Sequence, residues 1–410
     1  MKFANKLFIN KRIVFILYFA FAIAASIQSV LIIKPHNYID NITGKQYTFT
    51  DYNNYVIFKN SYNHLLANKD IYKLYLDEHW DLYKYSPTCS LFFGFFYALP
   101  DGIGLFFWNF LNAFVLLVAV YYLPRMSLKN KGLILASIVI ELMTCMQNEQ
   151  SNGLICGLII LAFGMLERGN YFMAILCIVF TAYIKLFGIV ALSLLIFYPG
   201  KWKLALYTLF WSIFLFLLPL TVIDFSQLKF LYLSWGKLLA NDHSISSGLS
   251  VAGWLKAWFD LGINKTLITV AGVVLFCLPL LRFKEYANYS FRLITLSSVL
   301  IWVVIFNHRA ESPTFIIAMS GAAIWFFSGS FKAENFVLFA LALIFTILSP
   351  TDIFPREIRT GWLEPYVIKA VPCILIWFKI LYDQLLTKKI QAPIQTEEQT
   401  SEEEQFGLTI

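Results

Sequence analysis

Charged residues are scarce in this sequence. Only 14% of its 410 residues are Asp, Glu, Lys or Arg, whereas soluble domains carry about 25%. Hydrophobic residues make up 59% of the chain and the mean hydropathy is +0.66. Apolar runs close to the length that crosses a bilayer as a helix recur along it. These proportions exclude a soluble enzyme and indicate an all-α polytopic membrane protein.

Patterns that mark several common chemistries are also missing. The sequence has no G-x-G-x-x-G, no G-x-x-x-x-G-K-[ST] and no D-x-D element, so no nucleotide-binding site is predicted. No H-E-x-x-H or comparable spacing indicates a metal, and we expect neither a metal nor a cofactor. The six cysteines lie in or beside apolar runs and form no C-x-x-C pair, so neither a zinc site nor a disulfide framework is indicated.

The positive charges are dispersed. The net charge is +7, but Lys and Arg are spread among short loops, so no nucleic-acid partner is indicated. Cytoplasmic loops are rich in Lys and Arg, and such residues precede the first apolar run, 13–33. We therefore expect a cytoplasmic N-terminus, external segments at 34–87 and 224–265, and about twelve crossings. The acidic segment 391–410 is expected to be a disordered cytoplasmic tail on a single membrane domain, 1–390.

Polar residues that do not suit plain loops all fall on the predicted outer side. They are Asp51, the run 147–152, Lys185, the run 308–311, Arg356 and Arg359. A transporter places its polar groups near the bilayer midplane, in broken helices of repeated halves, and this sequence shows no internal repeat. Because loops fixed on a rigid scaffold commonly carry chemistry, we expect an active site on the outer face, headed by the segment 34–87.

A carboxylate and several cations at this interface suit transfer from a phosphate leaving group. The carboxylate takes a proton from an acceptor hydroxyl, and the cations stabilise the departing phosphate. A donor that is reached from the membrane would explain why the site lies at a lipid interface, and a lipid phosphate-linked sugar is such a donor.

Several short motifs, taken in order, resemble those of glycosyltransferase family 87. In the first external segment these are Asp51-x-x-x-Tyr55, Leu65-Leu66, Asn68-Lys-Asp-Ile-Tyr72 and Tyr85-Ser-Pro87. Gln150-Ser-Asn152 is similar to the family's Gly-Gln-x-Asn element, with Glu149 at the Gly position. Lys185 is similar to the first residue of its Lys-x-x-Pro element, with Gly188 at the Pro position. The resemblance covers most of the chain, from Asp51 to Arg309.

This resemblance implies the fold of the lipid-dependent glycosyltransferases of the GT-C type, with short external helices. It implies transfer of a sugar, most simply mannose or another hexose, from a polyprenyl-phosphate donor to a lipid or glycan acceptor. The reaction would take place on the extracytoplasmic face of the plasma membrane (the inner membrane of a two-membrane cell), both termini being cytoplasmic. A catalytic Asp in the first external loop is also implied, and by position it is Asp51. We expect a monomer surrounded by membrane lipids.

Ten further residues are candidates for binding the donor or substrate: Tyr55, Tyr85, Gln150, Asn152, Lys185, His308, Arg309, Glu311, Arg356 and Arg359.

Each candidate has a plainer alternative. Asp51 could cap a helix over 52–66, and Lys185 could reach the interface as an isolated charge. Gln150 and Asn152 could cap neighbouring helices, and the last two arginines could bind lipid headgroups. Asp70 is a structural rival of Asp51 in the same loop. At the level of function, the alternatives are a transporter or flippase of lipid-linked sugars and a structural membrane subunit.

Overall fold

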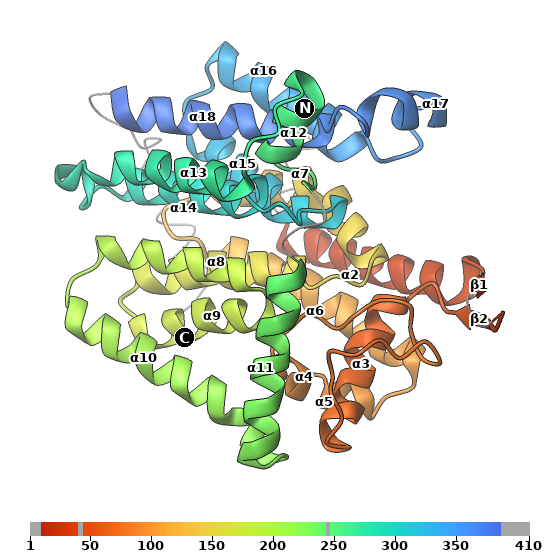
Figure 1. Cartoon of the computed structure of the whole chain (residues 1–410). Helices are drawn as coiled ribbons and strands as arrows, with labels where there is room; N and C mark the ends of the chain where they lie inside the picture. Colours follow the sequence, from red (N-terminus) through yellow and green to blue (C-terminus); the bar gives the residue numbers. More distant parts are fainter. Residues whose placement is uncertain (1–9, 40–43, 243–246, 387–410) are drawn as a thin grey trace.

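The computed structural model describes residues 10–39, 44–242 and 247–386. The predicted acidic tail, 391–410, lies outside them. Helices dominate the structure (Figure 1). In chain order the elements are α2 (Lys11–Ile27), η1 (Gln28–Ile32), β1 (His36–Ile39), β2 (Gln46–Phe49), α3 (Asn53–Leu66), α4 (Pro87–Phe92), α5 (Gly94–Tyr97), α6 (Asp101–Tyr122), α7 (Leu128–Gln147), α8 (Asn152–Glu167), α9 (Tyr171–Ile184), η2 (Leu186–Phe197), α10 (Lys201–Leu217), η3 (Leu218–Thr221), α11 (Phe225–Asp242), α12 (Val251–Phe259), α13 (Lys265–Leu280), η4 (Phe283–Glu285), α14 (Tyr289–Ile305), η5 (Ser312–Thr314), α15 (Phe315–Ser328), α16 (Ala333–Leu341), η6 (Ala342–Leu348), α17 (Arg356–Ile358), η7 (Arg359–Leu363), η8 (Ile368–Ala370) and α18 (Val371–Leu386).

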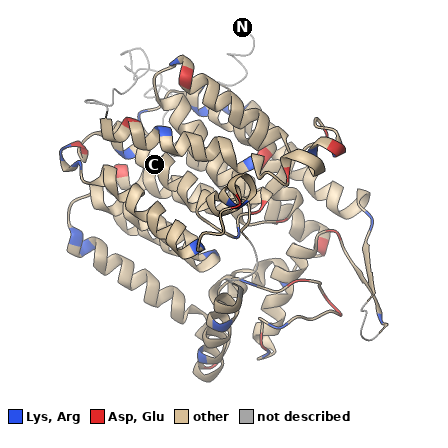
Figure 2. Ribbon diagram, turned by 45° about the horizontal axis from the view of Figure 1, so that its top comes forward, with Lys and Arg blue, Asp and Glu red and all other residues tan. Residues whose placement is uncertain are grey.

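The described helices include several that suit a bilayer. Within the described residues, Lys11–Ile32, Asp101–Tyr122 and Lys201–Thr221 are long and apolar enough to cross a membrane. A fourth span exists if Arg356–Leu363 and Ile368–Leu386, bent by 79° at their junction, count as one. Seven shorter apolar helices have 10–17 residues. Charged residues lie mostly at helix ends and in loops (Figure 2). A helical membrane protein is confirmed, and the number of about twelve crossings stays a prediction.

Helix α8 lies at the centre of the packing. It contacts α6, α9 and α15, and glycines on it admit the neighbouring backbone. A Cβ atom at Gly157 would lie 2.7 Å from the backbone nitrogen of Leu116 in α6. Small residues spaced four apart, here Gly153 and Gly157, allow such close approach of membrane helices. The α6–α8 pair therefore forms a rigid base under the loop that joins α7 to α8.

The C-terminal helices form a second layer. In Figure 1, α13, α14, α16 and α18 lie above α8, α9 and α10. All residues of α14 except Arg292 are buried, because α14 lies between α15, α18 and η2. Helices α3 to α5 stand to one side, next to α11, and the β1–β2 hairpin lies beyond them at the edge of the molecule.

A break at Lys185 divides the apolar stretch 171–199. Helix α9 ends at Ile184, Lys185 is extended with φ −138°, and the 3₁₀ helix η2 begins at Leu186. Gly188 packs against Thr181, where an added Cβ would lie 2.3 Å from its hydroxyl oxygen. The stretch therefore forms two short helices that meet at Lys185.

The prediction of an all-α protein is wrong for two short segments. β1 and β2 pair in antiparallel fashion, with Tyr38 opposite Tyr47 and His36 opposite Phe49. Aromatic residues on both strands favour such pairing. Four-residue strands in a polar segment carry no hydropathy signal of their own, so the apolar pattern that predicts the helices could not reveal them.

Candidate functional site

The two predicted external segments are joined. The hydroxyl of Ser234 in α11 donates to the Asp70 carboxylate, with both oxygens 3.0 Å away. The indole nitrogen of Trp235 donates to the carbonyl oxygen of Lys84 at 3.0 Å. Helix α11 thus holds the chain that leads to Tyr85. The contacts of Asp70 agree with the structural role expected for it.

The loop 148–152, between α7 and α8, is fixed from several sides. The side-chain amide of Asn54 in α3 donates to the carbonyl oxygen of Asn148 at 3.0 Å. The Trp108 indole donates to the carbonyl oxygen of Glu149 at 2.7 Å. Asn152, at the start of α8, is fully buried and donates to the carbonyl oxygen of Pro313 at 3.0 Å. The loop therefore contacts α3, α6 and the segment 308–313.

Lys185 points at this loop. Its ammonium nitrogen lies 3.1 Å from Oε1 of Gln150 and 2.9 Å from Oδ1 of Asn152. The Tyr85 hydroxyl donates to the same Gln150 oxygen at 3.3 Å, and the Lys185 nitrogen lies 5.7 Å from the centre of the Tyr85 ring. Four predicted site residues meet here, and we call Tyr85, Gln150, Asn152 and Lys185 the Lys185 cluster. Because Lys185 contacts polar side chains, it is not an isolated charge in lipid.

The position of Tyr85 follows from local bonds. Ser86 caps α4, its hydroxyl accepting from the backbone nitrogen of Cys89 at 3.2 Å. The same hydroxyl donates to the carbonyl oxygen of Tyr183 at 2.6 Å. Since Tyr183 lies two residues before Lys185, this bond holds the end of the first external segment against the α9–η2 break.

The segment 308–313 adds an acidic side chain to this region. Its carbonyl at Ala310 accepts from the backbone nitrogen of Leu249 at 2.8 Å. Glu311 is exposed, and its negative charge acts on both Lys185 and Tyr85. His308 and Arg309, partly buried, lie in the same segment. The predicted run 308–311 thus borders the Lys185 cluster.

Asp51 lies close enough to the loop 148–152 for its charge to act on Glu149. It is half-buried in the turn before α3, and Tyr52, not Asp51, is the N-cap residue of that helix. Burial raises the pKa of the Asp51 carboxyl above its ordinary value. Its negative charge acts on the buried carboxyl of Glu149. Glu149 and Gln150 are consecutive, so one short loop connects Asp51 to the Lys185 cluster.

Three candidates are not joined to this cluster by the contacts of the described residues. Tyr55 is fully buried, with its hydroxyl 3.5 Å from the carbonyl oxygen of Phe96, and packs against α5 and α6. Arg359 contacts the Pro350 carbonyl at 3.0 Å and Asp352 at 3.1 Å, within its own loop. Arg356 is exposed on α17. Roles for these three in binding stay predictions.

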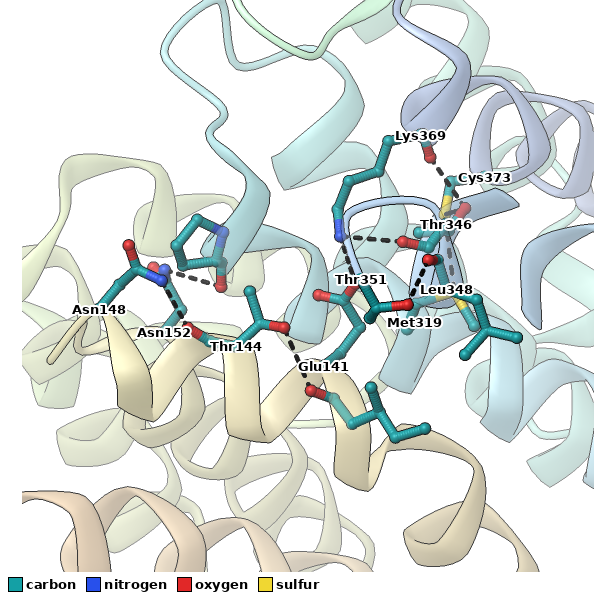
Figure 3. A network of polar contacts seen from close by, with 12 residues as sticks. Glu141, Thr144, Asn148, Asn152, Met319, Thr346, Leu348, Thr351, Lys369 and Cys373 are labelled. Atoms are coloured by element: carbon teal, nitrogen blue, oxygen red, sulfur yellow. Dashed lines mark hydrogen bonds and ion pairs between the residues drawn. The ribbon is translucent and has the colours of Figure 1, made fainter. Parts of the chain in front are cut away.

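A buried ion pair between Glu141 and Lys369 is not among the residues predicted from the sequence. The Lys369 ammonium points at the Glu141 carboxylate (Figure 3). Lys369 also donates to the carbonyl oxygen of Thr346 at 2.9 Å, and the Thr346 hydroxyl donates back to the Lys369 carbonyl at 2.8 Å. The pair links α7 with η6 and η8. A Glu within the apolar run 133–145 was the available signal, because a lone charge there is costly.

The chemistry of the site is that of a cation held by amide oxygens beside a carboxylate. Among the described residues, no group of three or more His, Cys, Asp or Glu side chains could hold a metal ion. The Lys185 cluster can instead bind an anion, and Asp51 can accept a proton.

The fold and this site together define a helical membrane protein in which a lysine is held by two amide side chains, with a carboxylate nearby. The model of glycosyltransferase family 87 matches residues 83–306, more than half of the chain, and the chain belongs to this family. No curated protein matches it. The matched residues include the whole Lys185 cluster, whereas Asp51 precedes them and the run 308–311 follows them. The protein is therefore a glycosyltransferase.

Proposed function

We propose that this glycosyltransferase moves a hexose, most simply mannose, from a polyprenyl-phosphate donor to a hydroxyl group of a lipid or glycan acceptor. The observation that carries the proposal is the contact of Lys185 with Gln150 and Asn152 beside Tyr85, in a chain of this family. A partly buried cation that faces amides suits a phosphate group, which a lipid-linked donor supplies.

Lys185 binds the leaving phosphate in this proposal. A lysine ammonium has three donors, and the two amide oxygens at 3.1 and 2.9 Å orient it. Its remaining donor can meet a phosphate oxygen. Such preorganised donors stabilise charge that develops in the transition state. The oxygen that links the sugar to phosphate gains negative charge as its bond to the sugar breaks, so the binding becomes stronger as the reaction proceeds.

Asp51 acts as the general base. The acceptor oxygen bonds to the anomeric carbon of the sugar, and the carbon–oxygen bond to the phosphate breaks. The phosphate leaves with the electron pair, and the acceptor proton passes to the Asp51 carboxylate. Burial raises the pKa of this carboxyl, which makes its ionised form a better proton acceptor.

The same proposal includes the GT-C type of fold, a monomer, and an active site on the extracytoplasmic face of the plasma membrane with both termini inside. The basic loops at 125–131, 201–203 and 282–284 support it, because such loops stay in the cytoplasm. An impermeant thiol reagent added to intact cells should label Asp77→Cys, whose position is exposed in the segment 34–87, but not the exposed Lys203→Cys. Labelling of the parent protein, with its own cysteines, is the background in both cases. The reverse pattern would place the site on the cytoplasmic side.

The activity is tested with purified protein in lipid nanodiscs. Polyprenyl-phosphate mannose and polyprenyl-phosphate glucose, each labelled in the sugar, are incubated with a membrane lipid extract, and labelled glycolipid is separated and counted. We expect product in the parent protein and its loss in Asp51→Asn. Movement of labelled donor across liposomes without a new glycosidic bond would instead support a flippase.

A further inference from the structure

Glu149 carries two unfavourable features at once. Its backbone has φ +48°, in the left-handed region that residues other than Gly seldom adopt. Its side chain is only 1% exposed, although a buried carboxyl is costly. Backbone outliers of this kind gather at functional sites. The family element has Gly at the position of Glu149. Gly adopts a positive φ without strain and has no side chain to bury, so the presence of a carboxyl here requires an explanation.

The partners of Glu149 differ from those of two other buried glutamates. Glu141 pairs with Lys369, and Glu167 pairs with Arg292 through contacts of 2.6 and 2.7 Å. The Oε1 atom of Glu149 accepts a hydrogen bond from the Ser29 hydroxyl at 3.2 Å, and the charged group that acts on this carboxyl is Asp51. The Ser29 hydroxyl, from η1, carries no charge. The Trp108 indole, from α6, donates to the backbone carbonyl of Glu149 and is also uncharged. Glu149 therefore faces another acid.

This environment favours the protonated form of Glu149. Burial, and next the negative charge of Asp51, raise its pKa well above the ordinary value, against a smaller opposite effect of the Ser29 bond. Two interacting carboxyl groups release their protons in separate steps. The half-buried Asp51 ionises first and the buried Glu149 second, so the pair holds one proton between the two steps.

We propose that Glu149 is a positioning residue that keeps its proton while Asp51 is ionised, so that the two carboxyls place one negative charge, not two, beside the site of an anionic phosphate. The role of Asp51 in this statement rests on the proposed function. Ionised Glu149 would repel the donor and would draw the loop 148–152 toward water. Gln150 and Asn152 lie in that loop, so their contacts with Lys185 depend on a neutral Glu149.

The proton on Glu149 is tested by infrared spectroscopy of the full chain in nanodiscs, which needs no turnover. The difference between the parent protein and Glu149→Gln at neutral pH should show the carbonyl band of a protonated acid. In an Asp51→Asn background the band should disappear at a lower pH, because the charge that raises this pKa is gone. No band at neutral pH, or the same midpoint in both backgrounds, would overturn the proposal.

Glu149→Gly provides a second variant in case the Gln variant fails to fold. Gly adopts a positive φ without strain and buries no carboxyl, so this variant should unfold at a higher temperature than the parent. The difference spectrum of the parent minus Glu149→Gly should contain the same acid band. Its absence from this spectrum would count against the proposal in the same way.

The kinetic consequence separates positioning from a purely structural role. Above the pH at which Glu149 ionises, the KM for the donor should rise about tenfold in the parent, as for a shift of one pKa unit, and rise less in Glu149→Gln. Lys185, the cation that faces the donor, loses its proton in both proteins, so the difference between the profiles reports Glu149. Identical profiles would overturn the proposal. A parent without transferase activity would refute only the proposed function, because the infrared result stands apart.

Discussion

The ammonium nitrogen of Lys185 lies 2.9 Å from Oδ1 of Asn152, a residue 33 positions earlier in the chain. Asn152 is in turn fixed by its bond to the carbonyl oxygen of Pro313. The amide therefore joins the α9–η2 break to the segment before α15. Among the described residues, the side chains within hydrogen-bond distance of this ammonium are amides and not carboxylates, so its positive charge is left for an anionic ligand.

Replacement of Lys185 should weaken donor binding. Hydrogen bonds to charged groups contribute about 1.5–3 kcal/mol, and every 1.4 kcal/mol is tenfold in affinity. We expect Lys185→Met to raise the KM for the donor at least about tenfold and to lower kcat as well, because the leaving phosphate loses its cation. Steady-state kinetics at several donor concentrations measure both.

Lys203→Met is the matched control, because Lys203 is an exposed lysine in the first turn of α10 and lies over the Tyr207 ring of the same helix. It should keep the kinetics of the parent. An unchanged donor KM in Lys185→Met would remove Lys185 from the phosphate site.

Asp51→Asn should abolish most of the turnover while the protein stays folded. A positioned general base contributes typically about 10²–10⁴-fold to the rate, and the amide cannot take up the proton. Stability should change little, because Tyr52 rather than Asp51 is the N-cap residue of α3. Turnover and the unfolding temperature in detergent are measured on the same preparation.

Asp70→Asn is the control in the same loop. Its carboxylate accepts from Ser234 and from the backbone nitrogen of Tyr72, so the variant should lose about 1 kcal/mol of stability and show a milder loss of turnover. If Asp51→Asn transfers sugar at near the parent rate, the base lies elsewhere.

The contact of Lys185 with Gln150 and Asn152 could be predicted from the sequence. A lysine inside an apolar run needs a polar partner or water, and the polar run 147–152 was predicted on the same side of the membrane. The position of the Tyr55 side chain could not be predicted from the sequence. It depends on the space left by Gly104 in α6, where an added Cβ would lie 1.9 Å from the Tyr55 hydroxyl, and no periodic pattern shows that contact.

The number of crossings illustrates the same limit. Apolar length predicts the span at 13–33, which the structure has as Lys11–Ile32. It does not decide how helices such as α9 and η2, which have 14 and 12 residues, sit in a bilayer. Glu141 and Lys369 are 228 residues apart, and hydropathy does not pair residues at such a distance.

The buried pair of Glu141 and Lys369 gives a stability prediction. Lys369→Met alone leaves the Glu141 carboxylate buried without its cation, and breaking a buried pair in this way costs about 3–5 kcal/mol. The double variant Glu141→Leu with Lys369→Met removes both charges and should recover most of that loss, because apolar replacement of a buried pair is commonly neutral or stabilising. Thermal unfolding of both single variants and the double variant completes the cycle. Additive losses would show that the two side chains do not interact.

The pH dependence of turnover follows from the burial of Asp51. Burial raises the pKa of its carboxyl above 3.8, so the ionised base forms at a higher pH than in an exposed aspartate. The folded chain therefore holds this proton longer than the unfolded chain does, and the ionisation of Asp51 lowers stability as the pH rises through the folded pKa. Turnover needs the ionised form, so it should increase with pH across that same pKa.

The acidic limb of kcat/KM in the parent protein should accordingly have its midpoint above the ordinary aspartate pKa of about 3.9. Asp70→Asn should keep this limb unchanged, because it leaves the surroundings of Asp51 intact. In Asp51→Asn the residual activity should lack the limb, and the loss of stability with rising pH through the same window should disappear. A midpoint at or below the ordinary value, or a limb that persists without the Asp51 carboxyl, would assign the proton transfer to another group.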